Sequence, residues 1–410
     1  MLSMISVEEA KRLILENTHV LDPVEVNLEE SLGLVLAEDI VSPLDLPAFT
    51  NSAMDGYALK SYDTEGAHEG FPAFLRIMGI IKAGDTANYE LKNGEAIKVM
   101  TGAPIPPGAD AVVMVEHTEV QEETLVVKRK IKPGENIRYK GEEIRRGDVA
   151  LLKGTVITPA SIGFLTELNV KRVRVYRKPK ISLVVTGEEL LAPDEEPRLG
   201  KIRDTNSITL KFALSREPTE VISVDRVRDR RSAIEEKVER ALRESDVVVI
   251  TGGVSTGDYD YVRGVLESLG VRSIFWKVLQ KPGGPLFFGK KDLTTVFGLP
   301  GNPASTLVCF YEYVLPSIRI MLGKNNKFLV EVDALISEEI RKKADNKTHF
   351  LRGYIQGNGK HLYVKLTGPQ GSHMLRSFAL SNCLIVVPQN VTYLAPGSPV
   401  KVHLLPEVFL

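Results

Sequence analysis

The chain of 410 residues has few cysteines and no long apolar segment. Cys309 and Cys383 are its only cysteines, and both stand in apolar runs, so the sequence predicts buried thiols and no disulfide framework. No apolar run reaches the length of a membrane span, and the N-terminus lacks the pattern of a signal peptide. We therefore expect a protein of the cytoplasm that has no contact with a membrane.

Several common signatures of binding and catalysis are also missing. The seven histidines show no metal-type spacing with cysteine or with one another. A G-x-S-x-G elbow, a Walker A loop and a complete G-x-G-x-x-G are all absent, which argues against a serine hydrolase, a P-loop NTPase and a dehydrogenase. The net charge of −1, without a basic stripe, gives no support for nucleic-acid binding. Glutamine is scarce as well, which hints at a thermophilic source.

A glycine-rich junction between an apolar run and a helical pattern is the most informative feature that is present. The run 247–250 leads into the sequence TGGVSTG and then to Asp258 and Asp260. Glycines let backbone N–H groups approach an anion, and two carboxylates beside such a cradle suit a divalent cation placed between them and a phosphate. The junction therefore predicts a phosphorylated ligand with a metal ion. The positions that we assign to the ligand are Gly252, Gly253, Ser255 and Gly257.

Two further junctions of the same kind support this interpretation, since a single one also arises for purely geometric reasons. The run 294–297 is followed by GLPGNP, in which Pro300 and Pro303 stiffen the turn before a helix. The run 181–185 ends in TGEEL, which contains Glu189. Loops that follow parallel strands meet at one edge of an open α/β sheet, where such sheets bind ligands. We expect these three loops to converge there.

The order of the patterns predicts several domains, as a chain of this length requires. Strands alternate with helices from 179 to about 323, which is typical of a wound α/β domain. Residues 46–145 and the segment from 327 onward consist of short strands, which favours a small β domain and a terminal β-barrel or sandwich. The predicted strands are 74–81, 96–100, 111–120, 125–129, 181–185, 220–224, 247–250, 273–278 and 294–297, and the predicted helices lie near 206–215, 230–243, 258–269 and 304–321.

Other polar residues gain meaning only beside the glycine loops. Taken alone, the loop around Asp55 is typical of a turn, and Lys277 and Lys281 are typical of solvated surface groups. Next to an anion cradle, these lysines become candidate oxyanion ligands, together with Arg352 as a bidentate donor and Ser372 as a neutral one.

Eight motifs in order carry a resemblance to a known family. They are NSAMDGYA (51–58), VMTGAPIPPGADAVVMVE (99–116), NIRYKGEEIRRGD (136–148), TGEEL (186–190), SDVVVITGGVSTGDYDYV (245–262), FWKVLQKPGGPLFFG (275–289), FGLPGNPAS (297–305) and FLRG (350–353). Together they closely resemble the molybdopterin molybdenumtransferases, the MoeA family, which includes the E domain of gephyrin. The resemblance runs over essentially the whole chain.

The resemblance implies a fold and a reaction. Members of the family insert molybdenum from molybdate into adenylated molybdopterin and release AMP. The implied fold is a multidomain α/β protein with a wound α/β molybdopterin-binding domain, an inserted β domain, an elongated linking domain and a C-terminal β-barrel. On this sequence, we place the linking domain at 24–45 and 146–178, the inserted β domain at 46–145, the α/β domain at 1–23 and 179–326, and the barrel at 327–410.

The resemblance also implies roles for individual residues. Asp229 and Asp260 would organise a metal ion, Mg²⁺ or another divalent cation, together with the pyrophosphate. The implied catalytic residues are Asp55, Thr101, Asp229, Asp260, Lys277 and Lys281. The implied substrate-binding residues are Arg138, Glu143, Glu189, Gly252, Gly253, Ser255, Gly257, Pro300, Pro303, Arg352 and Ser372.

The resemblance also has implications for partners, and it leaves the oxyanion ligands, the metal and a scaffold role open. It implies a homodimer with a shared cleft and transient contact with a molybdopterin adenylyltransferase. Glu143 stands where the family often has aspartate, TGEEL replaces TGDEL, and Gly284 stands where many members carry a lysine, so the oxyanion ligands are open. Either molybdate or tungstate suits such a site. The alternative is a non-catalytic molybdopterin-binding or scaffold protein of the gephyrin type, although the chain shows no extra linker segment.

Overall fold

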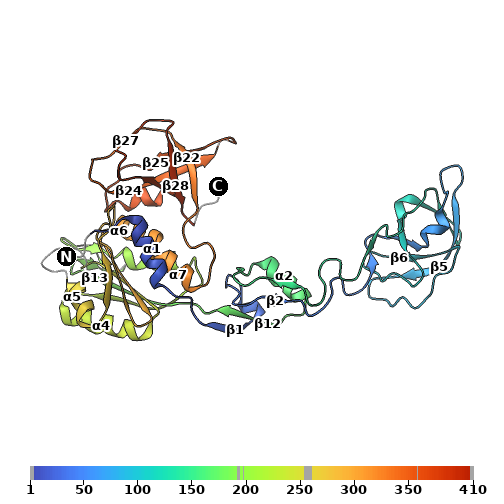
Figure 1. Cartoon of the computed structure of the whole chain (residues 1–410), viewed down its shortest axis with the longest axis horizontal. Coiled ribbons are helices and arrows are strands. Elements are labelled where there is room, and N and C mark those ends of the chain that lie inside the picture. The colour runs from blue at the N-terminus through green and yellow to red at the C-terminus, as the bar shows by residue number, and fades with distance from the viewer. Residues whose placement is uncertain (1–3, 192–193, 197, 254–260, 358, 407–410) are drawn as a thin grey trace. The chain divides into compact units, whose positions relative to one another are not determined.

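The structure is a computed structural model that describes residues 4–191, 194–196, 198–253, 261–357 and 359–406 (Figure 1). The chain divides into two compact units. The first unit contains residues 1–37, 154–159 and 172–410, and the second contains residues 38–153 and 160–171. The segments predicted to link the domains, 24–45 and 146–178, are thus shared between the units, and the four predicted domain boundaries stay predictions.

The first unit is built around a six-stranded sheet in the order β16-β13-β17-β21-β20-β18. The first four strands are parallel, as predicted from the alternation of strands and helices. β20 lies antiparallel to β21 and β18 antiparallel to β20, and β20 was not among the predicted strands. The bounds are β13 Lys180–Thr186, β16 Glu220–Val227, β17 Val247–Thr251, β18 Arg272–Trp276, β20 Phe287–Lys291 and β21 Thr294–Leu299.

Helices cover both faces of this sheet (Figure 1). Alternate residues of β17 show the reason, because Val247 and Val249 face one core whereas Val248 and Ile250 face the other. The first core includes α1 Val7–Asn17, α3 Asn206–Leu214, α6 Pro303–Cys309, the π-helical turn η4 Phe310–Val314 and α7 Leu315–Met321. The second core includes α4 Arg231–Glu244 and α5 Tyr261–Ser268. Ser6 caps the first helix, since its hydroxyl accepts a hydrogen bond from the Glu9 N–H at 3.1 Å.

A closed β-barrel follows the α/β domain in the same unit. Five strands pair in a ring, in the order β24-β25-β22-β28-β26 and back to β24, and β19 of the α/β domain adds to β24. The bounds are β19 Gln280–Lys281, β22 Glu331–Ile336, β24 Thr348–Gly357, β25 Leu362–Leu366, β26 Cys383–Val387 and β28 Pro399–Leu404. Beside the ring lie the strand pair β23 Ile340–Arg341 and β27 Tyr393–Leu394 and the short helix α8 Leu375–Ala379. The predicted C-terminal barrel is confirmed.

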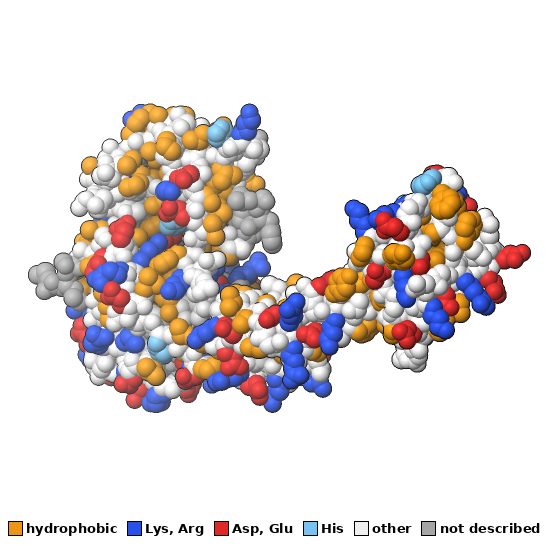
Figure 2. Space-filling view, turned by 45° about the vertical axis from the view of Figure 1, so that its right-hand side comes forward, with side chains coloured by type: hydrophobic (Ala, Val, Ile, Leu, Met, Phe, Trp, Pro, Cys, Tyr) orange, Lys and Arg blue, Asp and Glu red, His pale blue; other side chains and the backbone are white. Residues whose placement is uncertain are grey.

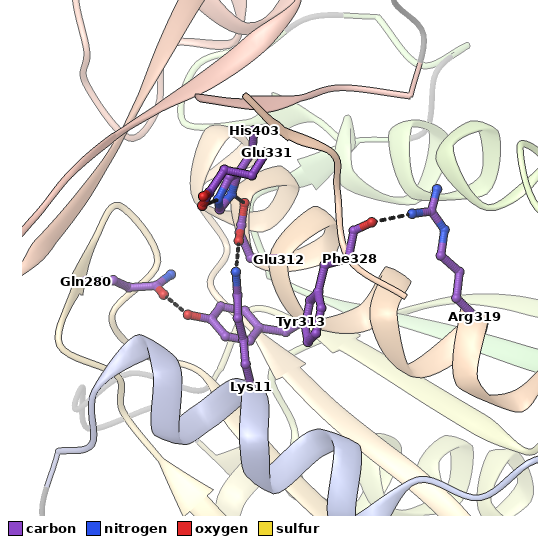
Figure 3. A network of polar contacts seen from close by, with 8 residues as sticks. All are labelled: Lys11, Gln280, Glu312, Tyr313, Arg319, Phe328, Glu331 and His403. Atoms are coloured by element: carbon purple, nitrogen blue, oxygen red, sulfur yellow. Dashed lines mark hydrogen bonds and ion pairs between the residues drawn. The ribbon is translucent and has the colours of Figure 1, made fainter. Parts of the chain in front are cut away.

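A buried ionic network joins this barrel to the α/β domain (Figure 3). Glu312, in the π-helical turn, is 2% exposed. Its carboxylate lies 2.6 Å from Lys11 Nζ on α1 and 2.7 Å from His403 Nδ1 on β28. Burial opposes ionisation of Glu312, but the charges of Lys11 and His403 outweigh it and lower its pKa to about 2. One buried carboxylate therefore connects three elements that are distant in sequence.

The second unit is a β domain with a six-stranded sheet in the order β7-β4-β6-β5-β9-β8. The sequence predicted one strand over 111–120, and this prediction was wrong. β7 ends at Met114, a 3₁₀ turn follows at Val115–His117, and β8 begins at Thr118, so that the two pieces lie at opposite edges of the sheet. The bounds are β4 Gly56–Leu59, β5 Ala73–Ile81, β6 Glu95–Val99, β7 Ala111–Met114, β8 Thr118–Gln121 and β9 Thr124–Val127.

Short strand pairs lie outside the three main sheets. β1 pairs with β12 in the first unit, and β2 with β11 and β3 with β10 in the second, which also holds helix α2. Their bounds are β1 Pro23–Asn27, β2 Ile40–Val41, β3 Asn51–Ser52, β10 Ile137–Arg138, β11 Val149–Leu151, β12 Arg172–Tyr176 and α2 Pro159–Glu167. None of the helices in the described ranges is both long and apolar enough to cross a membrane. On the face drawn in Figure 2, basic and acidic side chains are interspersed, in keeping with the small net charge.

Candidate active site

The loops that follow β13, β17 and β21 come together at one edge of the α/β sheet, as predicted. The Gly252 N–H donates a hydrogen bond to the carbonyl of Leu299 at 3.1 Å, which ties the β17 loop to the end of β21. Gly252 and Gly253 both have positive φ, 85° and 62°. A Cβ on Gly252 would lie 2.5 Å from the carbonyl oxygen of Thr186, and one on Gly253 would lie 2.7 Å from Val262. Glycine is therefore required for the close approach of these loops.

Two cavities open at this edge and share part of their lining. One, of about 860 Å³, extends from the loops toward the barrel, and the other, of about 710 Å³, extends along the ends of β13 and β16. Both are lined by Gly253, Gly301, Asn302 and His373. We name them the cationic cavity and the acidic cavity after their charged side chains. The first is lined by Lys281, Arg341, Lys342, Lys343 and Arg352 with one acidic residue, Glu339, and the second by Glu189, Asp204 and Asp229 with one basic residue, Arg203.

Arg352 is the most unusual residue of the cationic cavity. It lies on β24 and is 0% exposed. Its Nε donates to the Ser377 hydroxyl at 3.2 Å and its Nη2 to the Gly371 carbonyl at 3.0 Å, but its buried Nη1 has no hydrogen-bond partner. Burial lowers the pKa of the guanidinium to about 10, so it stays charged at neutral pH. A buried cation that forms no ion pair within the described ranges is suited to receive an anion.

Of the other predicted oxyanion ligands, two line the cationic cavity and one does not. Lys281 and Ser372 both line the cationic cavity. Ser372 accepts a hydrogen bond from the Asn302 side chain at 3.1 Å, and its carbonyl accepts one from the Ala304 N–H. Lys277 is not among the residues that line either cavity, and its ammonium group lies 4.3 Å from the centre of the Trp276 ring. The structure thus brings Lys281, Ser372 and Arg352 together and places Lys277 apart from them.

The acidic cavity contains the predicted metal ligand Asp229. Its carboxylate is half-buried and accepts a hydrogen bond from the Glu188 N–H at 3.2 Å. Burial raises the pKa of Asp229, the hydrogen bond from Glu188 opposes this, and the negative charge of Glu189 reinforces it. Within the described ranges, no group of three acidic, histidine or cysteine side chains is placed to hold a metal ion. Asp260, Ser255 and Gly257 lie outside the described residues.

The sequence analysis missed some polar residues of the cavities. Asn206 donates from its side chain to the Gly301 carbonyl at 2.8 Å, and Asn302 links the β21 loop to Ser372. His349 and Gln370 line the cationic cavity from the barrel side. The sequence did contain a pointer to Asn302, because this residue stands between Pro300 and Pro303 in the GLPGNP motif.

The predicted residues of the second unit are held by hydrogen bonds within that unit. The carboxylate of Asp55 accepts hydrogen bonds from the backbone N–H and the hydroxyl of Thr101, at 2.7 and 2.8 Å. These two bonds lower the pKa of Asp55. Arg138 on β10 pairs in register with Asn51 on β3, and Glu143 donates its N–H to the Leu46 carbonyl. Asp55, Thr101, Arg138 and Glu143 are all exposed.

Three regions of the chain match models of known protein families. Family models match as the MoeA N-terminal region (domain I and II) over residues 5–168, a probable molybdopterin binding domain over 182–320 and the MoeA C-terminal region (domain IV) over 336–405. A molybdopterin molybdenumtransferase of Haemophilus influenzae is 36% identical over 404 residues, 98% of either chain. The chain belongs to the MoeA family of molybdopterin molybdenumtransferases.

Other members of the MoeA family match over nearly the whole chain. A molybdopterin molybdenumtransferase of Staphylococcus epidermidis is 35% identical, with 98% of this chain and 95% of the relative covered. The crystal structure of the molybdopterin biosynthesis MoeA protein of Pyrococcus horikoshii has a TM-score of 0.85 and 33% identity, and covers 98% of this chain and 100% of that one. The resemblance inferred from the eight motifs, and the fold class it implied, are confirmed.

Most of the residues that line the acidic cavity belong to the probable molybdopterin binding domain. The C-terminal region contributes Arg352, Ser372 and His349 to the cationic cavity. Asp55, Thr101, Arg138 and Glu143 belong to the N-terminal region. The individual roles of these residues stay predictions.

Proposed function

We propose that this enzyme transfers molybdenum from its oxyanion to adenylated molybdopterin and releases AMP. The observation that carries the proposal is the buried, unpartnered Nη1 of Arg352 in a cationic cavity that adjoins an acidic one. An oxyanion would accept hydrogen bonds from Arg352, Lys281 and Ser372. The glycine loop at Gly252 and Gly253 would receive a phosphate. Substrate supply would come from a molybdopterin adenylyltransferase in transient contact.

A divalent cation fits the acidic cavity. Mg²⁺ usually takes one or two carboxylates together with substrate phosphates, so it does not require three protein ligands. The pKa of Asp229 is raised by burial beside Glu189, and a cation would relieve this repulsion. We propose that Asp229 holds Mg²⁺ together with Asp260, and that the cation balances the charge of the pyrophosphate.

Replacing Asp229 by asparagine tests this assignment. We expect AMP release to fall by about a hundredfold or more, because stabilisation by the metal is worth several kcal/mol. AMP release from adenylated molybdopterin is measured after adding molybdate, with and without Mg²⁺. Asp225→Asn is the matched control, since Asp225 lies on β16, four residues before Asp229, but pairs with Arg240 outside the cavities. If Asp229→Asn keeps both the rate and the requirement for Mg²⁺, Asp229 does not hold the metal.

We further propose that tungstate serves as well as molybdate. The two oxyanions carry the same charge and have nearly the same size. Donors such as Arg352 and Lys281 recognise charge and shape, so they separate the two ions weakly. A preference for molybdate beyond roughly a hundredfold, about 3 kcal/mol, in parallel insertion assays would contradict this.

A shared cleft in a homodimer is part of the proposal. Asp55 and Asp229 lie on different units of the chain, and the family resemblance implies that they meet across two subunits. Mixing inactive Asp55→Ala with inactive Asp229→Ala protein should restore about a quarter of the activity, because half of randomly mixed dimers carry one intact cleft. Mixed dimers that form, as judged by differently tagged subunits, but stay inactive would rule the shared cleft out.

A further inference from the structure

His349 is a cavity residue to which the family motifs assign no role. It lies on β24, where it pairs in parallel register with Lys281 of β19. His349 is 6% exposed and lines the cationic cavity together with Lys281 and Arg352. A titratable side chain thus lies beside Lys281 and lines the same cavity as Arg352, and both of these groups are proposed to hold the oxyanion.

A carboxylate holds the imidazole ring in one orientation. His349 Nε2 lies 3.1 and 3.0 Å from the two carboxylate oxygens of Asp345, four residues earlier in the chain. The ionised carboxylate only accepts hydrogen bonds, so Nε2 carries the hydrogen. Within the described part of the chain, Nδ1 has no hydrogen-bond partner and is left as a proton acceptor. A carboxylate that fixes the tautomer of a histidine is an arrangement used in proton transfer.

The surroundings of the ring keep it neutral near pH 7. Burial lowers the pKa of His349 below its usual value, the bond to Asp345 opposes this, and the positive charges of Lys342 and Lys281 reinforce it. Lys342 is not available to a ligand, because its ammonium donates to the carbonyls of Lys347 and Pro388 at 2.6 Å. On the neighbouring strand β26, the residue in register with His349 is the apolar Val387.

We propose that His349 carries a proton from a thiol of the substrate to the departing oxygen of molybdate. This proposal rests on the proposed molybdenum transfer. When molybdate reacts with a dithiol, two Mo–S bonds form and one Mo–O bond breaks. Both thiol protons leave in the water that is released, and the oxidation state of the metal is unchanged. His349 accepts one of these protons at Nδ1 and returns it to the oxygen, so the residue ends in its starting state. Asp345 is a positioning residue.

The pH dependence of the rate tests this role. Molybdenum insertion is measured with both substrates saturating, from about pH 5 to 8, around the usual range of histidine. For the wild type, the rate should fall on the acid side, where His349 becomes protonated and loses its acceptor. His349→Asn should lower kcat by about a hundredfold, a typical contribution of general acid–base catalysis, and remove the acid-side inflection. KM for molybdate should stay within about threefold, because the charged ligands remain.

Two more variants keep the test decisive. Asp345→Asn retains a hydrogen-bond acceptor but loses the charge, so the inflection should move to lower pH. His361→Asn, at an exposed position of the same barrel, should behave as the wild type. An unchanged pH profile in His349→Asn overturns the proposal, and if that variant does not fold, an unchanged profile in Asp345→Asn does so. If the wild type itself transfers no molybdenum, the proposed function fails instead.

Discussion

Replacing Arg352 by methionine is expected to weaken molybdate binding by at least a hundredfold, about 3 kcal/mol. The buried guanidinium supplies a full charge and an unpartnered Nη1 to the cationic cavity. The free energy of unfolding should change little, because removing a buried charge without an acidic partner offsets the lost hydrogen bonds to Gly371 and Ser377. Calorimetric titration with molybdate and denaturant unfolding of the same samples measure the two effects.

Arg319→Met is the matched control. Arg319 is also mostly buried, but its Nε pairs with Glu217 at 2.7 Å. Its Nη1 donates to the Phe328 carbonyl at 2.9 Å, as Figure 3 shows. Arg319→Met should destabilise the protein by about 1–3 kcal/mol, because the buried carboxylate of Glu217 loses a partner. Molybdate binding should stay unchanged. Arg352→Met protein that binds molybdate with wild-type affinity would show that the oxyanion lies elsewhere.

Replacing Glu312 by glutamine should destabilise the first unit by about 3–5 kcal/mol at neutral pH, because Lys11 and His403 lose the charge that they face. The pKa of Glu312 is lowered to about 2 in the folded state. Its contribution to stability is therefore complete above the ordinary value of about 4.5 and is lost as the pH falls from there to about 2. Unfolding midpoints of wild type and variant, measured across this range, should converge toward the acid end.

An exposed ion-pair set on α1, the helix that carries Lys11, is the control for Glu312. Arg12 contacts Glu9 and Glu16, and its side chain is 53% exposed. Arg12→Met should cost at most about 1 kcal/mol, because exposed pairs contribute little. If Glu312→Gln is no more destabilising than Arg12→Met, the buried network contributes no more to stability than an exposed ion pair.

Local sequence pattern was enough to predict some features, whereas others depend on strand pairing and on packing. Gly252 and Gly253 were predicted from local pattern alone, and their positive φ shows why no other residue fits there. The strand predicted over 111–120 was wrong, because its pieces pair at opposite edges of a sheet and periodicity carries no information on pairing. Lys277 and Lys281 were equally plausible as oxyanion ligands in sequence, but only Lys281 lines the cationic cavity.

The sequence by itself determined the family, the parallel strands of the α/β sheet and the glycine loops, because each of these depends on residues that are close together in the chain. Only the tertiary structure decided that Arg352 has an unpartnered nitrogen, that Asp345 orients His349 and that Glu312 connects Lys11 with His403. Burial and hydrogen-bond satisfaction depend on contacts that exist only once the chain has packed, and some of these join distant residues, such as Lys11 and Glu312, which are 301 positions apart.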